Sequence, residues 1–290
     1  MSALIPSWKK WLLTGLEEDG AAFDWTARSL AKLRPDTQAT QARLVAKANG
    51  IWAAATGLRA LELLSRELGS PLEIESSIED GARIVPGQTL CTWKGSARSI
   101  VIFERSFINL ASYTSGIATQ TRTIVDRVMA SGMKNPVRIT ATRKTLPGYR
   151  DLAVESTLIG GAHPHRFNLS GGLLLKENHI AAAGGITAAI RSARSTIPHL
   201  LKIEIEVRNL EELKEAISAG AEVIMLDNFS PEQIRTAVPL KTDGVCFEAS
   251  GGISLSNLDS YLIEGLDVIS IGALTHSVKA LDLSLLMSGT

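Results

Sequence analysis

The segment LKIEIEVRNLEELKEAISAGAEVIMLD, residues 201–227, decides the fold because it joins two short apolar strands through one helix. Its pattern predicts strands over 202–207 and 223–226 and a helix over 210–219. The alternation extends on both sides: further strands are expected at 137–141, 173–176, 245–249 and 268–271, and further helices at 151–159, 186–195, 231–238 and 256–263. Such alternation is typical of a parallel sheet covered by helices. Its length favours a closed α/β barrel, although periodicity does not exclude an open sheet.

The residues before this alternation mix the two patterns. Residues 36–50 suit a short helix or an edge strand, and residues 50–68 begin as an apolar strand and continue as an amphipathic helix. The segment 79–106 carries Asp-Gly, Pro-Gly and Lys-Gly turns between alternating apolar positions, which predicts antiparallel strands. A long helix is expected from Phe107 to a glycine cap at Gly132.

Composition excludes several classes of protein. The chain has 290 residues, 45% of them hydrophobic, and equal numbers of basic and acidic residues, 30 of each, so no overall charge favours nucleic acid or an anionic membrane. Cys91 and Cys246 have no partners at metal-ligand spacing, so we expect no disulfide framework, no zinc site and a reducing, cytoplasmic setting. No export signal and no apolar run long enough for a membrane anchor are expected.

Charged residues follow the expected strands, and chemistry in barrels lies at the carboxyl ends of strands. Four cations occupy such places: Arg143, Lys144, Arg166 and Lys176. Guanidinium groups bind carboxylate or phosphate in bidentate fashion and lysine adds a movable charge, so the set suits a ligand with several anionic groups. Each cation alone would more often be a solvated surface residue, but convergence on one face weakens that interpretation.

The carboxylates Glu206 and Asp227 end two expected strands. Such groups can hold Mg²⁺, directly or through water, or stabilise positive charge that develops on a sugar carbon. Ion pairing with nearby lysines is the structural alternative and does not exclude catalysis. Glu204 lies two residues earlier, on the same strand face, and could share the role.

Two glycine-bearing turns and a histidine pair complete the candidate site. EASGGIS, residues 248–254, and SIGALTHS, residues 270–277, follow the last two expected strands, where barrels often bind phosphate through backbone N–H groups. His165 is the better candidate for a polar contact or proton donor, whereas we interpret His179 as structural. His163 and His165 could face one ligand, but they lack a third partner for a metal site.

Eight motifs occur in an order and spacing that resembles the quinolinate phosphoribosyltransferase family: ERSFIN, TRKTLPGYR, GGAHPHR, LKENHI, EIEV, IMLDNF, EASGGI and IGALTHS. The resemblance begins near EEDGAAFDWT, residues 17–26, and covers nearly the whole chain. It implies an N-terminal α/β sandwich domain, residues 1–110, and a C-terminal α/β barrel with an incomplete set of strands, residues 111–290. A C-terminal segment returning to the first domain is compatible with it.

The resemblance also implies a homodimer with shared active sites, and an assembly larger than a dimer fits as well. It assigns quinolinate to Arg105 of the partner subunit, Thr142, Arg143, His165, Arg166 and Lys176. It assigns phosphoribosyl pyrophosphate and its Mg²⁺ to Lys144, Glu206, Asp227, Ser250, Gly251, Gly252, Gly272 and His276. The implied catalytic set is Lys144, Lys176, Glu206 and Asp227. The implied reaction forms nicotinate mononucleotide, pyrophosphate and CO₂ in NAD biosynthesis.

Two departures from the family pattern keep alternatives open. Ala141 stands where the family usually has Asp, and GGAHPHR replaces a run with a third glycine. The first alternative is the molybdenum-operon relative of the family, which tends to lack that Asp but would also lack LKENH and MLDNF, both present here. The second is a silent anion-binding protein, against which the retained Lys144, Glu206 and Asp227 argue.

Overall fold

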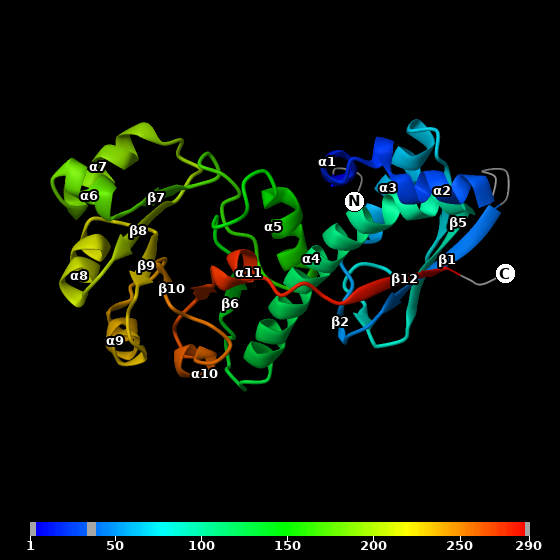
Figure 1. Cartoon of the computed structure of the whole chain (residues 1–290). Coiled ribbons are helices and arrows are strands. Elements are labelled where there is room, and N and C mark those ends of the chain that lie inside the picture. Colours follow the sequence, from blue (N-terminus) through cyan, green and yellow to red (C-terminus); the bar gives the residue numbers. More distant parts are fainter. Residues whose placement is uncertain (1–3, 34–38, 288–290) are drawn as a thin grey trace. The chain divides into compact units, whose positions relative to one another are not determined.

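The computed structural model describes residues 4–33 and 39–287 and divides into two compact units (Figure 1). The first unit takes Met1–Arg122, Leu146–Gly161 and Val278–Thr290, and the second takes Thr123–Thr145 and Ala162–Ser277. A boundary after residue 110 was expected, together with room for a C-terminal segment to return to the first domain. The structure places the division inside the long helix α4 (Ala97–Met129) and assigns the C-terminal segment to the first unit; the return of residues 146–161 was not expected.

The first unit contains a four-stranded antiparallel sheet in the order β12-β1-β5-β3. Its helices are α1 (Ile5–Glu18), α2 (Trp25–Leu33), α3 (Ala55–Glu67), the start of α4 (Ala97–Met129) and α5 (Arg150–Ile159), with a short 3₁₀ turn at Ala21–Phe23. Its strands are β1 (Ala39–Ala46), β2 (Gly50–Ile51), β3 (Leu72–Glu75), β4 (Arg83–Ile84), β5 (Thr89–Ser96) and β12 (Leu283–Met287). β12 pairs with β1 from Ala42 opposite Met287 to Ala46 opposite Leu283, so the end of the chain completes a sheet begun by its first strand.

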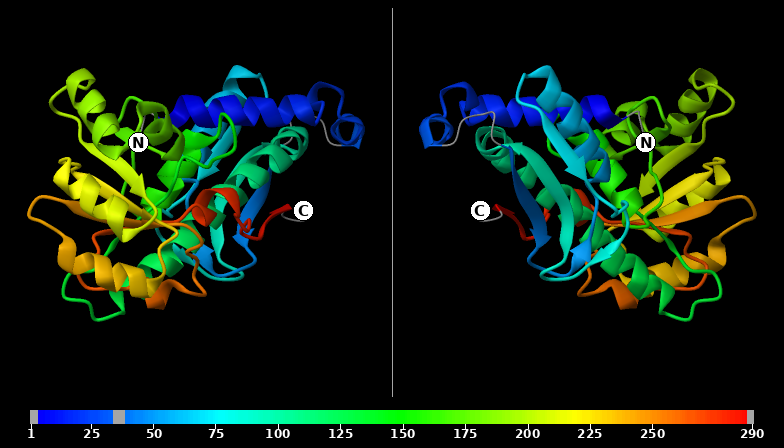
Figure 2. Two further views of the ribbon diagram at one scale, coloured as in Figure 1. Left: turned by 90° about the vertical axis from the view of Figure 1, so that its left-hand side faces the viewer. Right: turned by 90° about the vertical axis from the view of Figure 1, so that its right-hand side faces the viewer.

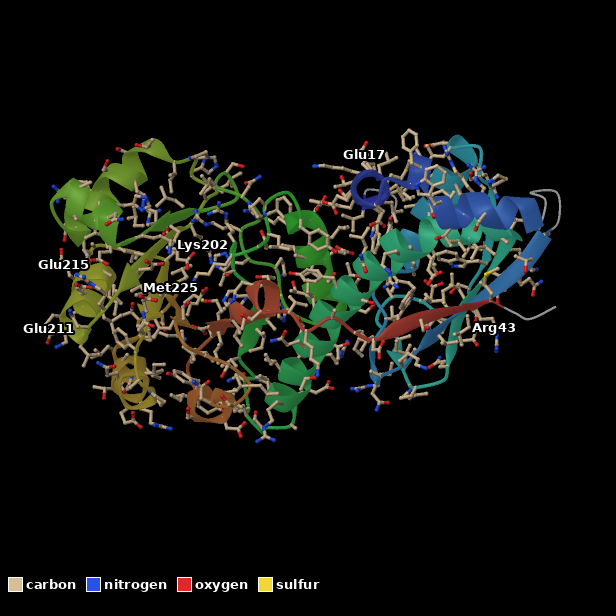
Figure 3. The ribbon with its side chains drawn as sticks, viewed as in Figure 1. Glu17, Arg43, Lys202, Glu211, Glu215 and Met225 are labelled. Atoms are coloured by element: carbon tan, nitrogen blue, oxygen red, sulfur yellow. The ribbon has the colours of Figure 1, made fainter. Side chains whose placement is uncertain are left out.

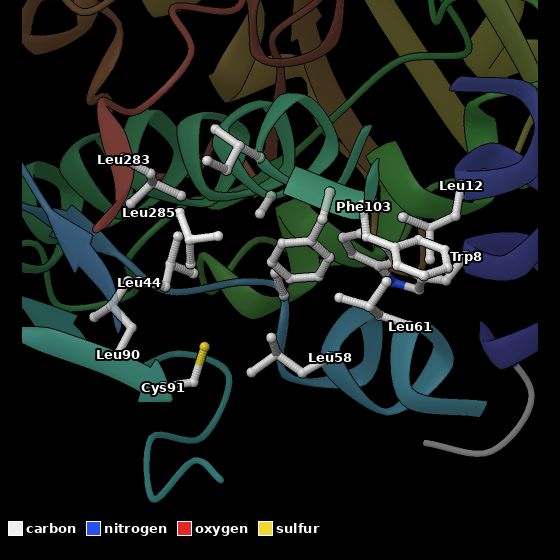
Figure 4. Packing of buried hydrophobic residues seen from close by; sticks show 14 of the residues in the cluster. Trp8, Leu12, Leu44, Leu58, Leu61, Leu90, Cys91, Phe103, Leu283 and Leu285 are labelled. Carbon is white, nitrogen blue, oxygen red and sulfur yellow. The ribbon is translucent and has the colours of Figure 1, made fainter. Parts of the chain in front are cut away.

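Aromatic residues fill the core of the first unit. The side chains of Trp52, Trp93 and Phe107 are buried, and the rings of Trp93 and Phe107 meet edge to face at 5.4 Å. Figure 4 shows part of this cluster, in which Phe103 lies among leucines and Cys91 lies next to Leu90. Burial raises the pKa of the Cys91 thiol to about 12, so this thiol stays protonated at neutral pH.

Several expectations for the first part of the chain are corrected. Residues 97–106, expected to be a strand, begin α4, because Ile100, Phe103 and Phe107 recur at helical spacing and are buried together. β1 is an inner strand and not an edge strand, since it pairs with both β12 and β5. α5, expected to belong to the barrel, is part of the first unit.

The second unit contains six parallel strands in the order β6-β11-β10-β9-β8-β7. The strands are β6 (Arg138–Thr140), β7 (Leu173–Leu175), β8 (Ile203–Val207), β9 (Val223–Asp227), β10 (Cys246–Ser250) and β11 (Val268–Ser270). The helices are α6 (Glu177–Ala183), α7 (Ile186–Thr196), α8 (Leu210–Ser218), α9 (Pro231–Ala237), α10 (Leu258–Tyr261) and α11 (Ala273–His276), with a 3₁₀ turn at Val238–Leu240. Among these strands β6 and β7 are the two edges, which confirms a barrel with an incomplete set of strands.

Helices flank the strands of the second unit (Figure 2). A buried apolar layer from both strands and helices forms its core. On β8, Ile203, Ile205 and Val207 are fully buried in that apolar layer, so the alternating Glu204 and Glu206 must lie on the opposite, enclosed side. Figure 3 shows Met225 on β9 within this unit and Glu211 of α8 at its outer edge. Three short helices differ from expectation: α6 and α11 were not foreseen, and α10 is shorter than predicted.

Candidate active site

A cavity of about 570 Å³ lies at the carboxyl ends of the strands of the second unit. Its lining consists of Thr142, Arg143, Lys144, His165, Arg166, Leu174, Lys176, Glu206, Met225, Asp227, Asn228, Glu248, Ser250, Gly251, Gly252 and Ser270. The four cations that the sequence singles out therefore share one cavity with both predicted carboxylates. The position agrees with the rule that barrel chemistry lies at the carboxyl ends of strands.

Three predicted site residues do not line this cavity. Gly272 and His276 flank it, because a Cβ added to Gly272 would lie 3.0 Å from Nε2 of His276 and 3.4 Å from Cδ of Lys144. The Thr275 hydroxyl donates to the backbone carbonyl of Lys144 at 2.8 Å, which ties the turn after β11 to that lysine. Arg105 is an exposed residue of α4 in the first unit.

At the mouth of the cavity, the Lys176 ammonium group is ion-paired with the Glu206 carboxylate. Lys176 follows β7 and caps the start of α6, while Glu206 projects from the neighbouring strand β8. The His179 ring accepts the backbone N–H of Lys176 at 3.0 Å through Nδ1, which confirms the structural interpretation of His179. The mouth residues are thus held by the local turn that follows β7.

The Asp227 carboxylate and the glycine turn after β10 meet at Asn228. The Asn228 amide donates to Asp227 at 2.9 Å, and its backbone N–H donates to the carbonyl of Ser250 at 2.8 Å. Asn228 has a φ of 56°, and a Cβ on Gly251, whose φ is 100°, would come within 2.2 Å of the Asn228 amide oxygen. Only glycine therefore fits at residue 251, so this turn is built for close approach.

A second group of charges lies one layer deeper. Nε2 of His165 is 3.6 Å from a carboxylate oxygen of Glu204 and 3.6 Å from one of Glu248. Both carboxylates are buried, with exposed residue fractions of 8% and 3%. In the described residues, these three are the one group of three or more side chains whose ligand atoms are close enough to hold a metal ion. The sequence expectation that His165 lacks such partners is corrected, because its partners come from distant strands.

Glu204 and Glu248 raise the pKa of His165 to about 10, which favours a second ring proton. A hydrogen bond opposes this, since the backbone N–H of Arg166 donates to Nδ1 of His165 at 2.8 Å and requires its lone pair. The two influences act on Nδ1, and both are compatible with a proton on Nε2, the nitrogen that faces the carboxylates at 3.6 Å. The Nε2 proton therefore lies between the two carboxylates.

The two arginines of the cavity are close enough to affect each other. Burial and the charge of Arg143 lower the pKa of Arg166, whose guanidinium donates to the carbonyl of Gly172 at 3.0 Å. An arginine remains charged at neutral pH even so. Two guanidinium groups held side by side repel each other without a ligand, and an anion between them would relieve that repulsion.

The carboxylates Glu206 and Asp227 fit Mg²⁺ as donors, because both are oxygen ligands lining this cavity and a smaller one of about 230 Å³ beside it. Glu204 does not join them: it faces His165 below and does not line the main cavity. Sequence reasoning places Asn228 and Glu248 at the ends of the strands but gives neither a role in the site. The signal for Glu248 was available, since Phe247 and Ala249 are apolar neighbours on β10 and Glu248 alternates with them.

Ala141, the departure from the family pattern, directly follows β6 and is buried in the apolar cluster between strands and helices. It does not line the cavity. His163 likewise lies away from the cavity: it forms a bridge to Thr140 and lines a separate cavity at the amino ends of the strands. His163 and His165 therefore do not face the main cavity together.

Comparison with known proteins covers nearly the whole chain. Two family models match, one described as the N-terminal domain of quinolinate phosphoribosyl transferase over residues 24–115 and one as its C-terminal domain over residues 117–286. A probable carboxylating nicotinate-nucleotide pyrophosphorylase of Bacillus subtilis is 39% identical over 269 residues, 92% of this chain and 89% of that protein. The human carboxylating nicotinate-nucleotide pyrophosphorylase is 35% identical over 288 residues, 98% of this chain and 91% of that protein.

Solved structures agree with the sequence matches. The nicotinate-nucleotide pyrophosphorylase of Francisella tularensis superposes with a TM-score of 0.88 at 33% identity, covering 98% of this chain and 97% of that one. NadC of Streptococcus pyogenes gives a TM-score of 0.86 at 34% identity, covering 96% and 94%. These matches favour neither of the alternatives drawn from the sequence. The chain belongs to the quinolinate phosphoribosyltransferase family.

Proposed function

We propose that this protein is a quinolinate phosphoribosyltransferase, which converts quinolinate and phosphoribosyl pyrophosphate into nicotinate mononucleotide, pyrophosphate and CO₂ for NAD biosynthesis. The observation that carries the proposal is the single cavity in which four cations meet two carboxylates. Both substrates are polyanions, and their reaction develops positive charge on a sugar carbon. A site for this reaction needs both signs of charge close together.

The proposed quinolinate subsite is the part of the main cavity that is lined by Arg143, Arg166 and Lys176. Two adjacent arginines can each take a carboxylate in bidentate fashion, and Lys176 can follow the ligand as a point charge. Because Lys176 is paired with Glu206 in the free protein, an arriving carboxylate must compete with Glu206 for that lysine. Thr142 and His165 border the same subsite, and Arg105 of the partner subunit would complete it.

The proposed phosphoribosyl subsite is formed by Lys144 and the glycine turns that follow β10 and β11. Lys144 stands beside Gly272 and His276, and the turn Ser250, Gly251, Gly252 brings backbone close to Asp227 through Asn228. Such turns accommodate phosphate oxygens without a side chain in the way. Glu206 and Asp227 would hold Mg²⁺, which supplies charge neutralisation for the leaving pyrophosphate when it is bound.

The chain's own residues account for the steps as follows. Lys176 and Arg166 hold the pyridine so that its nitrogen faces C1 of the ribose. The lone pair of the nitrogen forms the new bond to C1 while the C1–O bond to pyrophosphate breaks. The electron pair of the broken bond leaves with the pyrophosphate oxygen. Glu206 and Asp227 stabilise the positive charge on the sugar during this exchange. The C2–carboxylate bond of the ring then breaks, CO₂ departs, and C2 takes a proton.

We also infer that the protein works as a homodimer with shared sites in the cytoplasm. The family resemblance motivates the shared site: it assigns Arg105, a residue of the first unit, to quinolinate together with residues that line a cavity of the second unit. Both cysteines are free, which suits a reducing compartment. None of the helices in the described part of the chain is both long and apolar enough to cross a bilayer.

The test of the reaction incubates purified protein with quinolinate, phosphoribosyl pyrophosphate and Mg²⁺, with nicotinate as a parallel substrate. Nicotinate mononucleotide and CO₂ should form from quinolinate alone, and Asp227→Asn should serve as the inactive control. Product from nicotinate, or none from quinolinate while binding is still detected, would remove the proposal in favour of one of the alternatives.

A mixing experiment tests the shared site. Arg105→Ala and Arg143→Ala subunits are each expected to be inactive, and unfolding and refolding them together should regain activity, because a mixed dimer contains one site with neither substitution. Each variant refolded alone is the control. Absence of recovery in a mixture shown to contain mixed dimers would rule out donation of Arg105 across subunits.

A further inference from the structure

The barrel of the second unit is hollow at both ends, and one layer of side chains separates the two hollows. The cavity at the amino ends of the strands measures about 570 Å³ and shares His165, Arg166 and Glu248 with the substrate cavity. Glu204 lines only the amino-end cavity. His165, Glu204 and Glu248, here called the floor triad, therefore form the boundary between the two cavities.

The two carboxylates of the floor triad are buried although burial of a charged group lowers the stability of the fold. Each carboxylate has one oxygen 3.6 Å from Nε2 of His165, while the other oxygen, Oε1, is buried without a hydrogen-bond partner among the protein atoms described. A buried carboxylate without full pairing costs stability. Two such groups aimed at one imidazole from β8 and β10 call for a functional reason.

The imidazole ring of His165 is constrained from both of its nitrogens. Nδ1 accepts the backbone N–H of Arg166 at 2.8 Å, and the Nε2 proton points between the two carboxylates. The next residue, Arg166, is anchored in turn by its donation to the Gly172 carbonyl at 3.0 Å. Fixing the ring of His165 therefore also fixes the backbone from which the Arg166 guanidinium reaches the substrate cavity.

We propose that Glu204 and Glu248 are positioning residues for quinolinate: from below the substrate cavity they hold the His165 ring with its proton on Nε2, and through that ring they place Arg166 for a substrate carboxylate. The inference rests on the proposed function for its substrate, but its geometry is independent of it. Neither carboxylate contacts the reacting atoms in this account. Their effect passes entirely through His165.

A double-mutant cycle is the sharpest test, since it asks whether Glu248 acts through His165. In the otherwise natural protein, Glu248→Gln should raise the KM for quinolinate about tenfold, because a displaced Arg166 weakens one charge-assisted hydrogen bond to the substrate carboxylate. It should change kcat and the KM for phosphoribosyl pyrophosphate less than about twofold. In a His165→Ala background the same substitution should change the quinolinate KM less than about twofold. Equal effects in the two backgrounds, or none in the first, would overturn the proposal.

Glu204→Gln should behave as Glu248→Gln does. The matched control is Glu222→Gln, an equally conservative change at a barrel carboxylate that binds Arg194 and the backbone N–H of Ile203 on the outer side. It should leave all three kinetic constants unchanged. An equal rise in quinolinate KM for Glu222→Gln would show a general loss of barrel structure and would contradict a specific role for the floor triad.

A spectroscopic measurement keeps the proposal testable if the variants fail to fold or the reaction proves different. Nitrogen NMR of His165 in the natural protein, assigned by comparison with His165→Ala, should show Nε2 fully protonated, and the protonated fraction of Nε2 should fall in Glu248→Gln. A ring without a proton on Nε2 in the natural protein would refute the inference. Absence of nicotinate mononucleotide from the natural protein, with this ring signature intact, would refute the proposed function alone.

Discussion

The sheet of the first unit buries Trp93 against Phe107, whereas the strands of the second unit enclose Glu204, Glu248 and His165. Both units bury apolar side chains. In the second unit these side chains lie on the outer side of the strands, where Ile203 and its neighbours face the helices. Burial of each such side chain contributes about 1.5–3 kcal/mol. That outer layer stabilises the barrel and leaves its interior free for charges, which an aromatic interior could not accommodate.

The largest effect should come from breaking the aromatic interior. Trp93→Ala should lower the free energy of unfolding by about 3–5 kcal/mol, because it removes a fully buried ring and leaves a cavity. Chemical denaturation followed by circular dichroism measures it. At a temperature where the variant is folded, its KM values should equal those of the natural protein; a large rise in quinolinate KM would show that the two interiors are not separable.

In the charged interior, a substitution at Asp227 should reduce activity and leave stability unchanged. Asp227→Asn should lower kcat about 10²–10³-fold, because one group that stabilises the developing sugar charge is lost, and it should weaken the dependence of the rate on Mg²⁺. Denaturation should show no loss of stability, since the carboxylate lies at a cavity and its named partner is the amide of Asn228. Unchanged kinetics would remove Asp227 from the mechanism.

A substitution at Arg166 should affect the binding of one substrate much more than the binding of the other. Arg166→Ala removes a charge-assisted contact of about 1.5–3 kcal/mol, so quinolinate binding should weaken at least tenfold while phosphoribosyl pyrophosphate binding changes little. Isothermal titration with each substrate measures this, and Arg194→Ala, a cation that pairs with Glu222 outside both the main cavity and the smaller one, is the control. Equal weakening of both substrates would mean that the two subsites are assigned wrongly.

The smallest expected effect measures how much the buried charges of the second unit lower the free energy of unfolding. Glu248→Gln should raise the free energy of unfolding by about 1 kcal/mol, because it removes one of two buried carboxylates that face each other across His165 and leaves a neutral amide. The same substitution should impair quinolinate binding. Thermal unfolding at neutral pH gives the sign; a clear loss of stability would show that the floor triad stabilises the fold and would end the contrast between the interiors.

Local patterns were sufficient for the elements of the second unit. Apolar alternation placed β8 and β9 within a residue or two, and the charges at strand ends identified Arg143, Arg166 and Glu206 as residues that share a cavity. Both results follow from the pleat of a strand and from the rule that parallel strands end on one side. The motifs in the same segments were enough to indicate the family.

Contacts between distant segments lay outside the reach of such patterns. The segment 97–106 has apolar residues that suit a strand as well as a helix, and packing in the first unit decided for the helix. The return of β12 to β1 depends on pairing across most of the chain. Which of Glu204 and Glu206 meets Lys176 depended on strand register, which no local pattern specifies.

By itself, the sequence determined the alternation of strands and helices, the charge balance, the family and the residues at the carboxyl ends of the strands. Only the tertiary structure decided the division within α4, the exclusion of Ala141 and His163 from the cavity, and the floor triad. The physical reason is distance along the chain: His165, Glu204 and Glu248 come from segments about 40 residues apart, and only the order of parallel strands brings their side chains into one layer.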